Sequence, residues 1–366
     1  MEKNITKPLL SQNSQQLQEQ EQPQQWISND VRFLFEVAVM LVGNGTMSIV
    51  GIVGNCINLV VFAKSGFKET VNMLFGLAFA DLLSLLTVFW CCVCYALGMV
   101  DPPDLPFDPL AFWYVTAAWP HLVCTRLTCW VTALVAVERC LCVKYLVTPK
   151  RIACILVAIF TLLPSSYIPI FCVHTMKEAF DPEVNRTRIV AAFARNRYHV
   201  VQVSYYINDV ALPTLSIAIV LVCTFTMTRA LSSSAKWKQD RVHTVSHVVS
   251  VTDSSNILNS AGSGSGGRKA MGNKPQQAVM KEVRVAKMVQ FISAMFVVCF
   301  SPCVLLLYIR FGYPEIGMWR EQHNMYVCLY GVVFFMEISN SSLNFFVYLH
   351  FNTNFKKTFD NIFNRQ

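Results

Sequence analysis

Two adjacent ionisable residues, Glu138 and Arg139, stand near the end of a long apolar segment and are followed by Cys140. The chemistry open to this pair is ion pairing, because an arginine cannot lose its proton and needs an anion or water at a helix end. A positive stretch, Lys144 to Arg151, comes next in the chain. Charges are costly beside hydrocarbon, so this placement indicates that this end of the segment meets water.

Further charged residues lie deep inside apolar segments, among them Asp81, Arg126, Asp209 and Glu337. Asp81 has no charged neighbour in the sequence. A carboxylate at membrane depth is a functional candidate by default. The alternative is a protonated Asp81 in a polar packing network, because burying an unpaired charge is costly.

The sequence shows no pattern of residues typical of an enzyme active site. No apolar segment carries a nucleophile with a paired base, a metal-ligand set or a phosphate-binding loop, so we expect no enzyme. Cys91, Cys92 and Cys94 cluster without a His or Cys partner at metal-ligand spacing, and we interpret them as small apolar residues. The net charge of +8 lies mostly in segments expected at the cytoplasmic face, which favours anionic lipid and not nucleic acid as its partner.

Composition places these residues in a membrane. Charged residues make up 14% of the chain and apolar ones 54%, against about 25% charged residues in ordinary soluble proteins. The apolar residues form blocks near the length of a membrane-spanning helix, roughly 20 residues. These blocks fall at about 35–64, 69–97, 111–144, 149–173, 199–231, 282–311 and 323–349. We therefore predict an all-α membrane protein, a bundle of seven transmembrane helices with a short amphipathic helix after the seventh span.

The distribution of Lys and Arg predicts the orientation of the bundle. Basic residues gather between spans one and two, three and four, and five and six, and again at Lys356 and Lys357 after span seven. One contrary loop, 174–198, is also basic, but the other loops outnumber it. The positive-inside rule then places the N-terminus outside and the C-terminus inside, as for a multi-pass protein of the plasma membrane. Glycosylation sequons at Asn4 and Asn185 fall on the predicted outer side.

Three segments outside the spans have their own composition. Residues 1–32 are polar and Gln-rich, which predicts a disordered extracellular tail before the membrane-spanning domain 33–351. Residues 232–279 are rich in Ser and Gly and predict a flexible cytoplasmic loop. In 352–366, the spacing of the apolar residues opposite Lys356 and Lys357 predicts an amphipathic helix on the inner membrane surface.

The order of several motifs resembles the rhodopsin-like (class A, family 1) G-protein-coupled receptors, from about residue 50 to residue 359. The sequence around these motifs is similar to that of the invertebrate neuropeptide-type and chemosensory-type branches of this family. The matching residues are Gly54-Asn55, Leu77-Ala78-Phe79-Ala80-Asp81, Glu138-Arg139-Cys140, Pro213, Cys299-Phe300-Ser301-Pro302, Asn344-Phe345-Phe346-Val347-Tyr348 and Phe355. Cys140 stands for the Tyr of the family pattern, Phe300 for its Trp and Phe345 for its Pro.

The resemblance implies a two-state switch at the inner end of the bundle. Arg139 would pair with Glu138 and Glu282 at rest and release Glu282 when span six swings outward, with Asn344 and Tyr348 as neighbours in the active state. The alternative is that Glu282 only solvates the start of its helix, because surface ion pairs contribute little.

The resemblance also implies an allosteric sodium ion at Asp81, with no cofactor required. Its shell would be Thr128, Asn340, Ser341 and Asn344, whose side-chain oxygens suit a small hard cation. Such an ion would favour the resting state.

A ligand pocket in the outer half of the bundle is the third implication of the resemblance. Arg126 and Asp209 should face each other, either as a structural pair or as a ligand anchor. His121 stands where amine receptors carry an Asp, which argues against a biogenic amine. The expected pocket residues are His121, Arg126, Tyr205, Tyr206, Asp209, Phe300 and Glu337.

Departures from the family pattern bear on partners. Tyr114 takes the place of the Cys that normally bonds the second outer loop, so the outer lid would lack its covalent link. The chain has little tail after Phe363, which leaves the Ser and Thr residues of the third cytoplasmic loop for a kinase and arrestin. We expect a receptor that binds an extracellular peptide and activates a heterotrimeric G-protein. The alternatives are a chemosensory receptor for a small molecule, a membrane transporter or channel, and a receptor-like chain that no longer couples.

Overall fold

The computed structural model describes residues 25–66, 69–100, 105–141, 148–181, 185–194, 197–230, 273–317 and 320–363. Within these residues, seven helices are long and apolar enough to cross a membrane. They run over Asn29–Ser65, Val71–Val100, Tyr114–Cys140, Lys150–Val173, Arg197–Ala230, Val283–Gly312 and His323–Phe351. The mostly helical fold and the spans predicted from apolar blocks are confirmed.

Several spans are built from more than one helical segment, and π-helical stretches widen three of them. Span one consists of α2 (Asn29–Phe35), η1 (Glu36–Gly43) and α3 (Asn44–Ser65), and span two is α4 (Glu69–Val100). Span three consists of η2 (Tyr114–Ala118) and α6 (Trp119–Leu141) and is preceded by the short α5 (Pro109–Trp113). Span four consists of α7 (Pro149–Ser166) and α8 (Ile168–Val173). Spans five to seven consist of α9 (Arg197–Ser204), η3 (Tyr205–Ala211) and helical residues 212–230; α11 (Asn273–Gly312); and α12 (His323–Phe351), which is followed by α13 (Thr353–Phe363).

Local chemistry sets the helix boundaries. Ser28 caps α2 by accepting a hydrogen bond from the Val31 backbone N–H at 3.3 Å. Thr148 caps α7 in the same way, and Pro149 occupies its first turn, where no backbone donor is needed. The first span ends at Gly66, whose φ of +79° is a conformation that glycine adopts readily.

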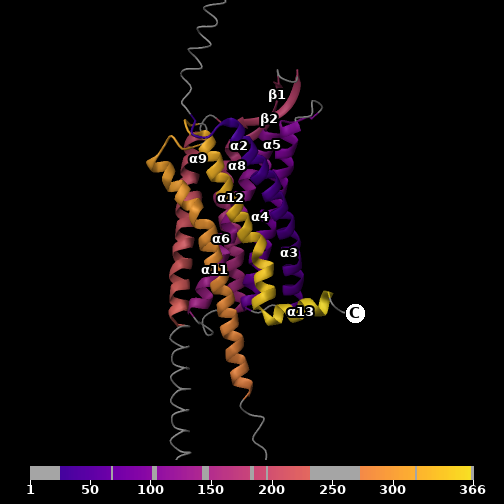
Figure 1. Ribbon diagram of the computed structural model, residues 1–366, viewed down its shortest axis with the longest axis vertical. Helices are drawn as coiled ribbons and strands as arrows, with labels where there is room; N and C mark the ends of the chain where they lie inside the picture. The colour runs from indigo at the N-terminus through magenta and orange to yellow at the C-terminus, as the bar shows by residue number, and fades with distance from the viewer. Residues whose placement is uncertain are drawn as a thin grey trace, which may run out of the picture.

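The first and the last described helices, α2 and α13, lie at opposite ends of the bundle, as an odd number of spans requires. Figure 1 shows α2 and the two strands at one end, and α13 with the C-terminus at the other. At the α13 end, α11 extends well beyond the bundle (Figure 1). This arrangement makes a multi-pass protein with two chemically different faces.

A β-hairpin covers part of the end where α2 begins, and the sequence pattern had not indicated it. Strands β1 (His174–Asp181) and β2 (Arg186–Phe193) pair antiparallel, with His174 opposite Phe193. Ile189 also exchanges two backbone hydrogen bonds with the segment before α5, from Asp108 N–H at 3.0 Å and to the Pro106 carbonyl at 2.9 Å. The described residues of the contrary basic loop thus form an ordered hairpin of β1 and β2, which we call the lid.

Side-chain contacts hold this lid where the family pattern has a disulfide. The cysteines of the described residues are free, as the absence of a Cys at Tyr114 predicted. The Tyr114 hydroxyl lies 3.5 Å from Nε2 of His174, while Nδ1 of His174 lies 2.8 Å from the Ile170 carbonyl. The Tyr114 ring also packs edge-on against Trp119. An aromatic and polar contact therefore connects span three to the start of the hairpin.

Apolar clusters fill the bundle interior. The largest contains residues of all seven spans and of α13, among them Phe62, Leu74, Val131, Ile292 and Phe355. The outward faces keep their apolar side chains exposed, as expected for helices surrounded by lipid. The fourth span is the least enclosed of the seven candidates.

The segments outside the spans differ in detail from the sequence expectation. α11 begins at Asn273, so the end of the predicted loop 232–279 is helical, and residues 231–272 lie outside the described part. Residues 1–24 of the predicted tail also lie outside it. Trp26, a residue of the predicted tail, is described. Its backbone N–H donates to the side-chain oxygen of Gln322, just before α12, at 2.9 Å.

The short helix after span seven is confirmed as α13. Its first turn is capped by Asn352, whose side-chain oxygen accepts hydrogen bonds from the N–H groups of Asn354 and Phe355. Phe355 is buried against Phe62 and Tyr348 with ring centroids 5.3 and 5.7 Å apart. These aromatic contacts fix α13 across the end of the bundle.

Candidate functional site

Asp81 forms the centre of a buried hydrogen-bond network that joins spans two, three and seven. Its Oδ1 accepts from the hydroxyls of Thr128 at 2.8 Å and Ser341 at 3.0 Å. Its Oδ2 accepts from the side-chain amide of Asn344 at 2.7 Å. Asp81 has no exposed surface, so these donors replace the hydration that its carboxylate lacks. The structure thus brings together most of the shell predicted from the sequence.

The oxygen-rich surroundings of Asp81 fit a small hard cation. The side-chain oxygens of Asn340 and Asn344 are buried without a hydrogen-bond partner. They lie one turn apart on α12 and so share a face of that helix. Thr128 and Ser341, which bond Asp81, also bear side-chain oxygens, the ligand atoms that a hard cation prefers. Asn55 of span one supports this set by donating to the Ser341 carbonyl at 2.9 Å.

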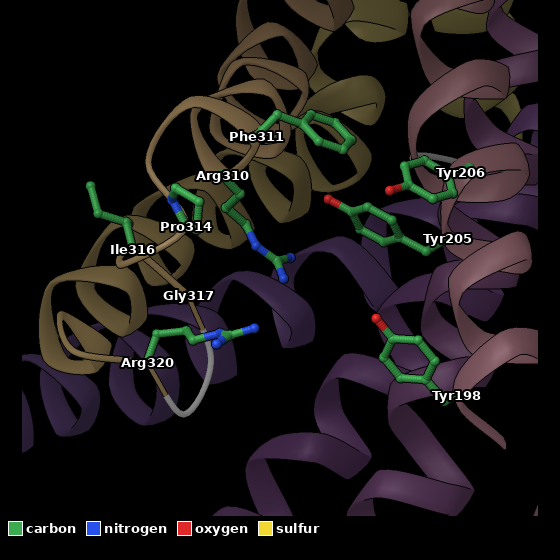
Figure 2. Close-up of a pocket in the computed structure, with 9 residues that line it drawn as sticks. All are labelled: Tyr198, Tyr205, Tyr206, Arg310, Phe311, Pro314, Ile316, Gly317 and Arg320. Carbon is green, nitrogen blue, oxygen red and sulfur yellow. The ribbon is translucent and has the colours of Figure 1, made fainter.

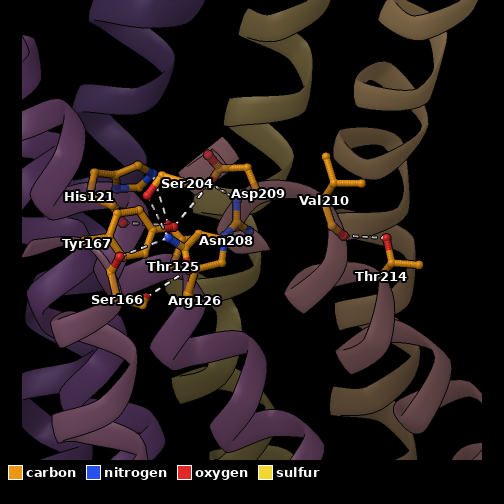
Figure 3. A network of polar contacts seen from close by, with 10 residues as sticks. All are labelled: His121, Thr125, Arg126, Ser166, Tyr167, Ser204, Asn208, Asp209, Val210 and Thr214. Carbon is orange, nitrogen blue, oxygen red and sulfur yellow. Dashed lines mark hydrogen bonds and ion pairs between the residues drawn. The ribbon is translucent and has the colours of Figure 1, made fainter. Parts of the chain in front are cut away.

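Arg126 and Asp209 form a second buried polar centre, between spans three and five. Arg126 Nη2 lies 3.2 Å from Asp209 Oδ1, and the two side chains are 2% and 10% exposed. The Tyr167 hydroxyl donates to the same carboxylate oxygen at 3.2 Å and brings in span four (Figure 3). The predicted pairing of Arg126 with Asp209 is confirmed, and its role in ligand binding stays a prediction.

The π-helical segment η3 explains how Asp209 reaches this position. Pro213 has no backbone N–H to donate to the Asp209 carbonyl four residues earlier, so the regular helical ladder is interrupted there. The neighbouring Asn208 bonds Ser166 at 2.8 Å and Ser204 at 3.2 Å (Figure 3). Spans four and five are therefore tied together by the residues beside the ion pair.

Arg126 has donors left over, and a second acid lies near it. Its Nε and Nη1 are buried without a hydrogen-bond partner. Glu337 of span seven is buried and interacts electrostatically with Arg126, and one of its carboxylate oxygens also has no hydrogen-bond partner. One permanently charged side chain thus lies among carboxylates from two different spans.

His121 belongs to a polar cluster with span two. Its Nδ1 lies 3.4 Å from the hydroxyls of both Ser84 and Thr87, and its Nε2 lies 3.2 Å from that of Thr125. The ring packs edge-on against Phe334 of span seven with centroids 4.8 Å apart. These contacts make His121 a buried connector of three spans.

A cleft of about 260 Å³ opens at the end of the bundle that carries the hairpin. It lies between the start of span five, the end of α11 and the segment that follows α11 (Figure 2). Its lining residues are Tyr198, Tyr205, Tyr206, Arg310, Phe311, Pro314, Ile316, Gly317 and Arg320. Of the residues predicted to form a ligand pocket, Tyr205 and Tyr206 line this cleft.

The other predicted pocket residues lie deeper and do not line it. His121, Arg126, Asp209 and Glu337 are buried in the polar clusters described above. Phe300 is also buried, and its ring packs on Phe296 with centroids 4.7 Å apart. Sequence reasoning missed the cations of the cleft. Arg310 could have been noticed as a lone charge in the last turn of a predicted span.

The inner end of span three carries the Glu138–Arg139 pair. Arg139 Nε lies 2.6 Å from Glu138 Oε2. Glu282 falls within α11, but its side chain lies outside the described residues, so its contact with Arg139 stays a prediction. Tyr348 is fully buried, and its ring packs edge-on against Phe62 with centroids 5.2 Å apart.

The two sequons have different outcomes. Asn185 is exposed at the turn between β1 and β2, with a positive φ of 54° that asparagine tolerates. This position is accessible to a modifying enzyme. Asn4 lies outside the described residues. The described part of the chain has no group of three or more His, Cys, Asp or Glu placed to hold a metal ion.

Comparison with known families finds no family model that matches this chain, and no curated protein matches it either. Its class therefore follows from its own structure. Seven candidate spans, a short terminal helix and buried polar centres between the spans make the chain a multi-pass helical membrane protein.

Proposed function

We propose that this protein is a rhodopsin-like G-protein-coupled receptor of the plasma membrane. The observation that carries the proposal is the Asp81 network. It joins spans two, three and seven through Thr128, Ser341 and Asn344. These residues belong to the shell around Asp81 that the family resemblance implies. A carboxylate on span two that accepts hydrogen bonds from spans three and seven is sensitive to the relative packing of all three.

In the proposed mechanism, an extracellular ligand shifts an equilibrium between two packings of the bundle. The N-terminus is extracellular, so the hairpin end receives the ligand and the α13 end binds the heterotrimeric G-protein. Outward movement of α11 would free Arg139 from its acidic neighbours and open the inner face. The protein works as a switch and not as an enzyme.

Sodium, when bound, would supply a positive charge that neutralises the Asp81 carboxylate within the bundle. Asp81, Thr128, Ser341 and Asn344 would hold it, together with Asn340. These side chains join three spans, so they resist relative movement of those spans. This is the property that a resting-state stabiliser needs.

A peptide is the first choice of ligand, and a small chemosensory molecule is the second. The hairpin lid and the outer cleft provide a broad polar surface of the kind a peptide can use. Membrane lipid is the expected partner of α13. A kinase and arrestin are expected to act on the Ser and Thr residues of the third cytoplasmic loop.

The test is guanine-nucleotide exchange on purified heterotrimers. Full-length protein in nanodiscs would be mixed with members of each G-protein class, with and without a pooled peptide library, and empty nanodiscs would give the baseline. We expect faster exchange with at least one class, and loss of that effect in Arg139→Ala. Exchange at the baseline rate with every class, with and without peptides, would refute the proposal.

A further inference from the structure

The outer cleft gathers positive charge and phenolic hydroxyls around one space. Figure 2 shows the side chains of Arg310 and Arg320 extending from one side and the hydroxyls of Tyr198, Tyr205 and Tyr206 from the other. None of the described residues that line the cleft is acidic. Each polar side chain among them can therefore donate a hydrogen bond, and none of them carries a negative charge.

Aromatic rings hold Arg310 in place. Its guanidinium carbon lies 5.4 Å from the ring centroid of Tyr205 and 5.2 Å from that of Tyr326. Contacts of this kind restrain the planar group without using its N–H donors. Within the described residues, no carboxylate lies within ion-pair distance of Arg310. The guanidinium is positioned, and its donors stay available for another molecule.

Gly317 allows the second cation to lie beside the first. A Cβ built at this position would lie 3.3 Å from Cγ of Arg320 and 3.8 Å from Nε of Arg310. Both arginine side chains therefore pass close to one small residue of the segment after α11. Arg320 is exposed and Arg310 is half-buried, so the cleft has an outer and an inner cation.

We infer that this cleft binds a carboxylate group of the ligand, held by Arg310 and Arg320 and by the tyrosine hydroxyls. Guanidinium groups match the geometry of a carboxylate, because two parallel N–H groups can donate to its two oxygens. The inference rests on the proposed receptor function for its biological meaning. It deepens that proposal by naming the chemical class of the group that the outer end recognises.

The size and apolar walls of the cleft indicate how much of the ligand enters. A volume of about 260 Å³ lies below the range of roughly 300–1,000 Å³ for sites that enclose a drug-sized molecule. Phe311 stacks on Tyr206 with centroids 5.8 Å apart, and on the side of the segment after α11, Ile316 is buried in a cluster with Leu306, Tyr326 and Val333. The cleft therefore suits one end of a ligand, a carboxylate attached to an apolar or aromatic group.

Such a group can come from the C-terminus of a peptide or from a small aromatic acid. The experiment uses matched pairs that differ only in the carboxylate. N-acetylphenylalanine and its amide represent a peptide end, and 3-phenylpropionate and its amide represent a small acid. Binding of each to the full-length protein in nanodiscs would be measured by saturation-transfer NMR titration.

We expect at least one of the two acids to bind about tenfold or more tightly than its amide, because the amide cannot accept from two guanidinium groups as an anion does. Arg310→Gln and Arg320→Gln should each remove most of this preference and leave the amide unchanged. Arg310→Lys should keep part of it, because the charge remains but the planar fork is lost. Arg229→Gln, an exposed cation near the opposite end of the bundle, is the control.

Equal binding of acid and amide in both pairs would overturn the inference. So would an acid preference that survives in Arg320→Gln, an exposed substitution that should leave the fold intact. A preference in only one pair would identify the source of the carboxylate as peptide or small acid. Because no G-protein is present, carboxylate binding without nucleotide exchange would refute the receptor proposal alone, and exchange without carboxylate preference would refute this inference alone.

Discussion

The buried pair Arg126–Asp209 gives the sharpest test of the packing between spans three and five. The perturbation is a cycle of apolar substitutions: Arg126→Met, Asp209→Leu and the double variant. Each replaces a charged side chain by an apolar one of similar size. The measured quantity is the free energy of unfolding.

The two single changes should differ in cost, because the structure leaves different groups behind. In Arg126→Met, Asp209 keeps the hydrogen bond from Tyr167 and can take up a proton, so we expect a loss of about 2 kcal/mol. In Asp209→Leu, the arginine stays charged in a site where its side chain is 2% exposed. Breaking a buried pair in this way costs about 3–5 kcal/mol.

The double variant should recover most of this loss. Replacing both partners of a buried ion pair by apolar residues is often neutral, so we expect a cost of about 1 kcal/mol or less. The double variant would then be at least about 4 kcal/mol more stable than the sum of the single effects predicts. Glu337 limits the effect of Asp209→Leu, because it leaves Arg126 one acidic neighbour.

Reversible unfolding in mixed detergent micelles, titrated with sodium dodecyl sulfate and followed by tryptophan fluorescence, would give these free energies. Arg229→Met removes an exposed cation and should change stability by no more than about 0.5 kcal/mol. Single effects that add within about 0.5 kcal/mol in the double variant would show that the two residues are not coupled, and the reasoning would fail.

Three further predictions follow from the other contacts. Replacing the choline in the buffer by sodium should raise the melting temperature of the wild type by about 2–4 °C and leave that of Asp81→Asn unchanged. Equal responses of the two proteins would argue against a cation site. His174→Leu should speed hydrogen exchange in β1 and β2, because it removes the acceptor of Tyr114; unchanged exchange would show that this contact does not hold the lid. Gly51→Ala should lower the free energy of unfolding by about 1–3 kcal/mol in the same detergent titration, because its Cβ would lie 2.5 Å from Ser342 Oγ. In Gly45→Ala the nearest atom is 4.0 Å away, so an equal loss there would contradict the steric explanation.

The spans were predictable because hydrocarbon imposes one simple requirement on every helix that crosses it. Apolar length alone placed the seven segments, including the fifth, which contains Asp209 and Pro213. The hairpin was not predictable in this way. Its strands are held by pairing with each other and with the segment before α5, a long-range arrangement that no local period in 174–193 reveals.

The buried centres were predictable where charge was the signal. An isolated charge in an apolar span needs a partner, which marked Arg126 and Asp209 as candidates, and the family resemblance implied that the two face each other. Neutral partners carry no such signal. Tyr167 and Asn208 join the same network through a hydroxyl and an amide, groups that are common in spans and mostly bond their own helix.

The outer cleft shows a third limit. Arg310 ends an apolar span, a position where a cation normally needs no explanation beyond its favourable interaction with the helix dipole. Arg320 lies in a short exposed segment after it. Only the packing of Tyr205 and Tyr326 against Arg310 distinguishes a positioned guanidinium from a solvated one.

The distribution of polar contacts along span three bears on which helix is free to move. Thr128 bonds Asp81 of span two, and Arg126, two residues earlier, faces Asp209 of span five. Rotating span three would break contacts on two sides at once, each buried and therefore costly to lose. The central contact of span three with α11 is apolar instead, a cluster that includes Ala133, Phe296 and Phe300. Apolar surfaces can slide and repack without leaving a buried donor or acceptor unpaired, and Pro302 removes a backbone hydrogen bond within α11. The physical asymmetry therefore favours α11 as the moving element and span three as the fixed one.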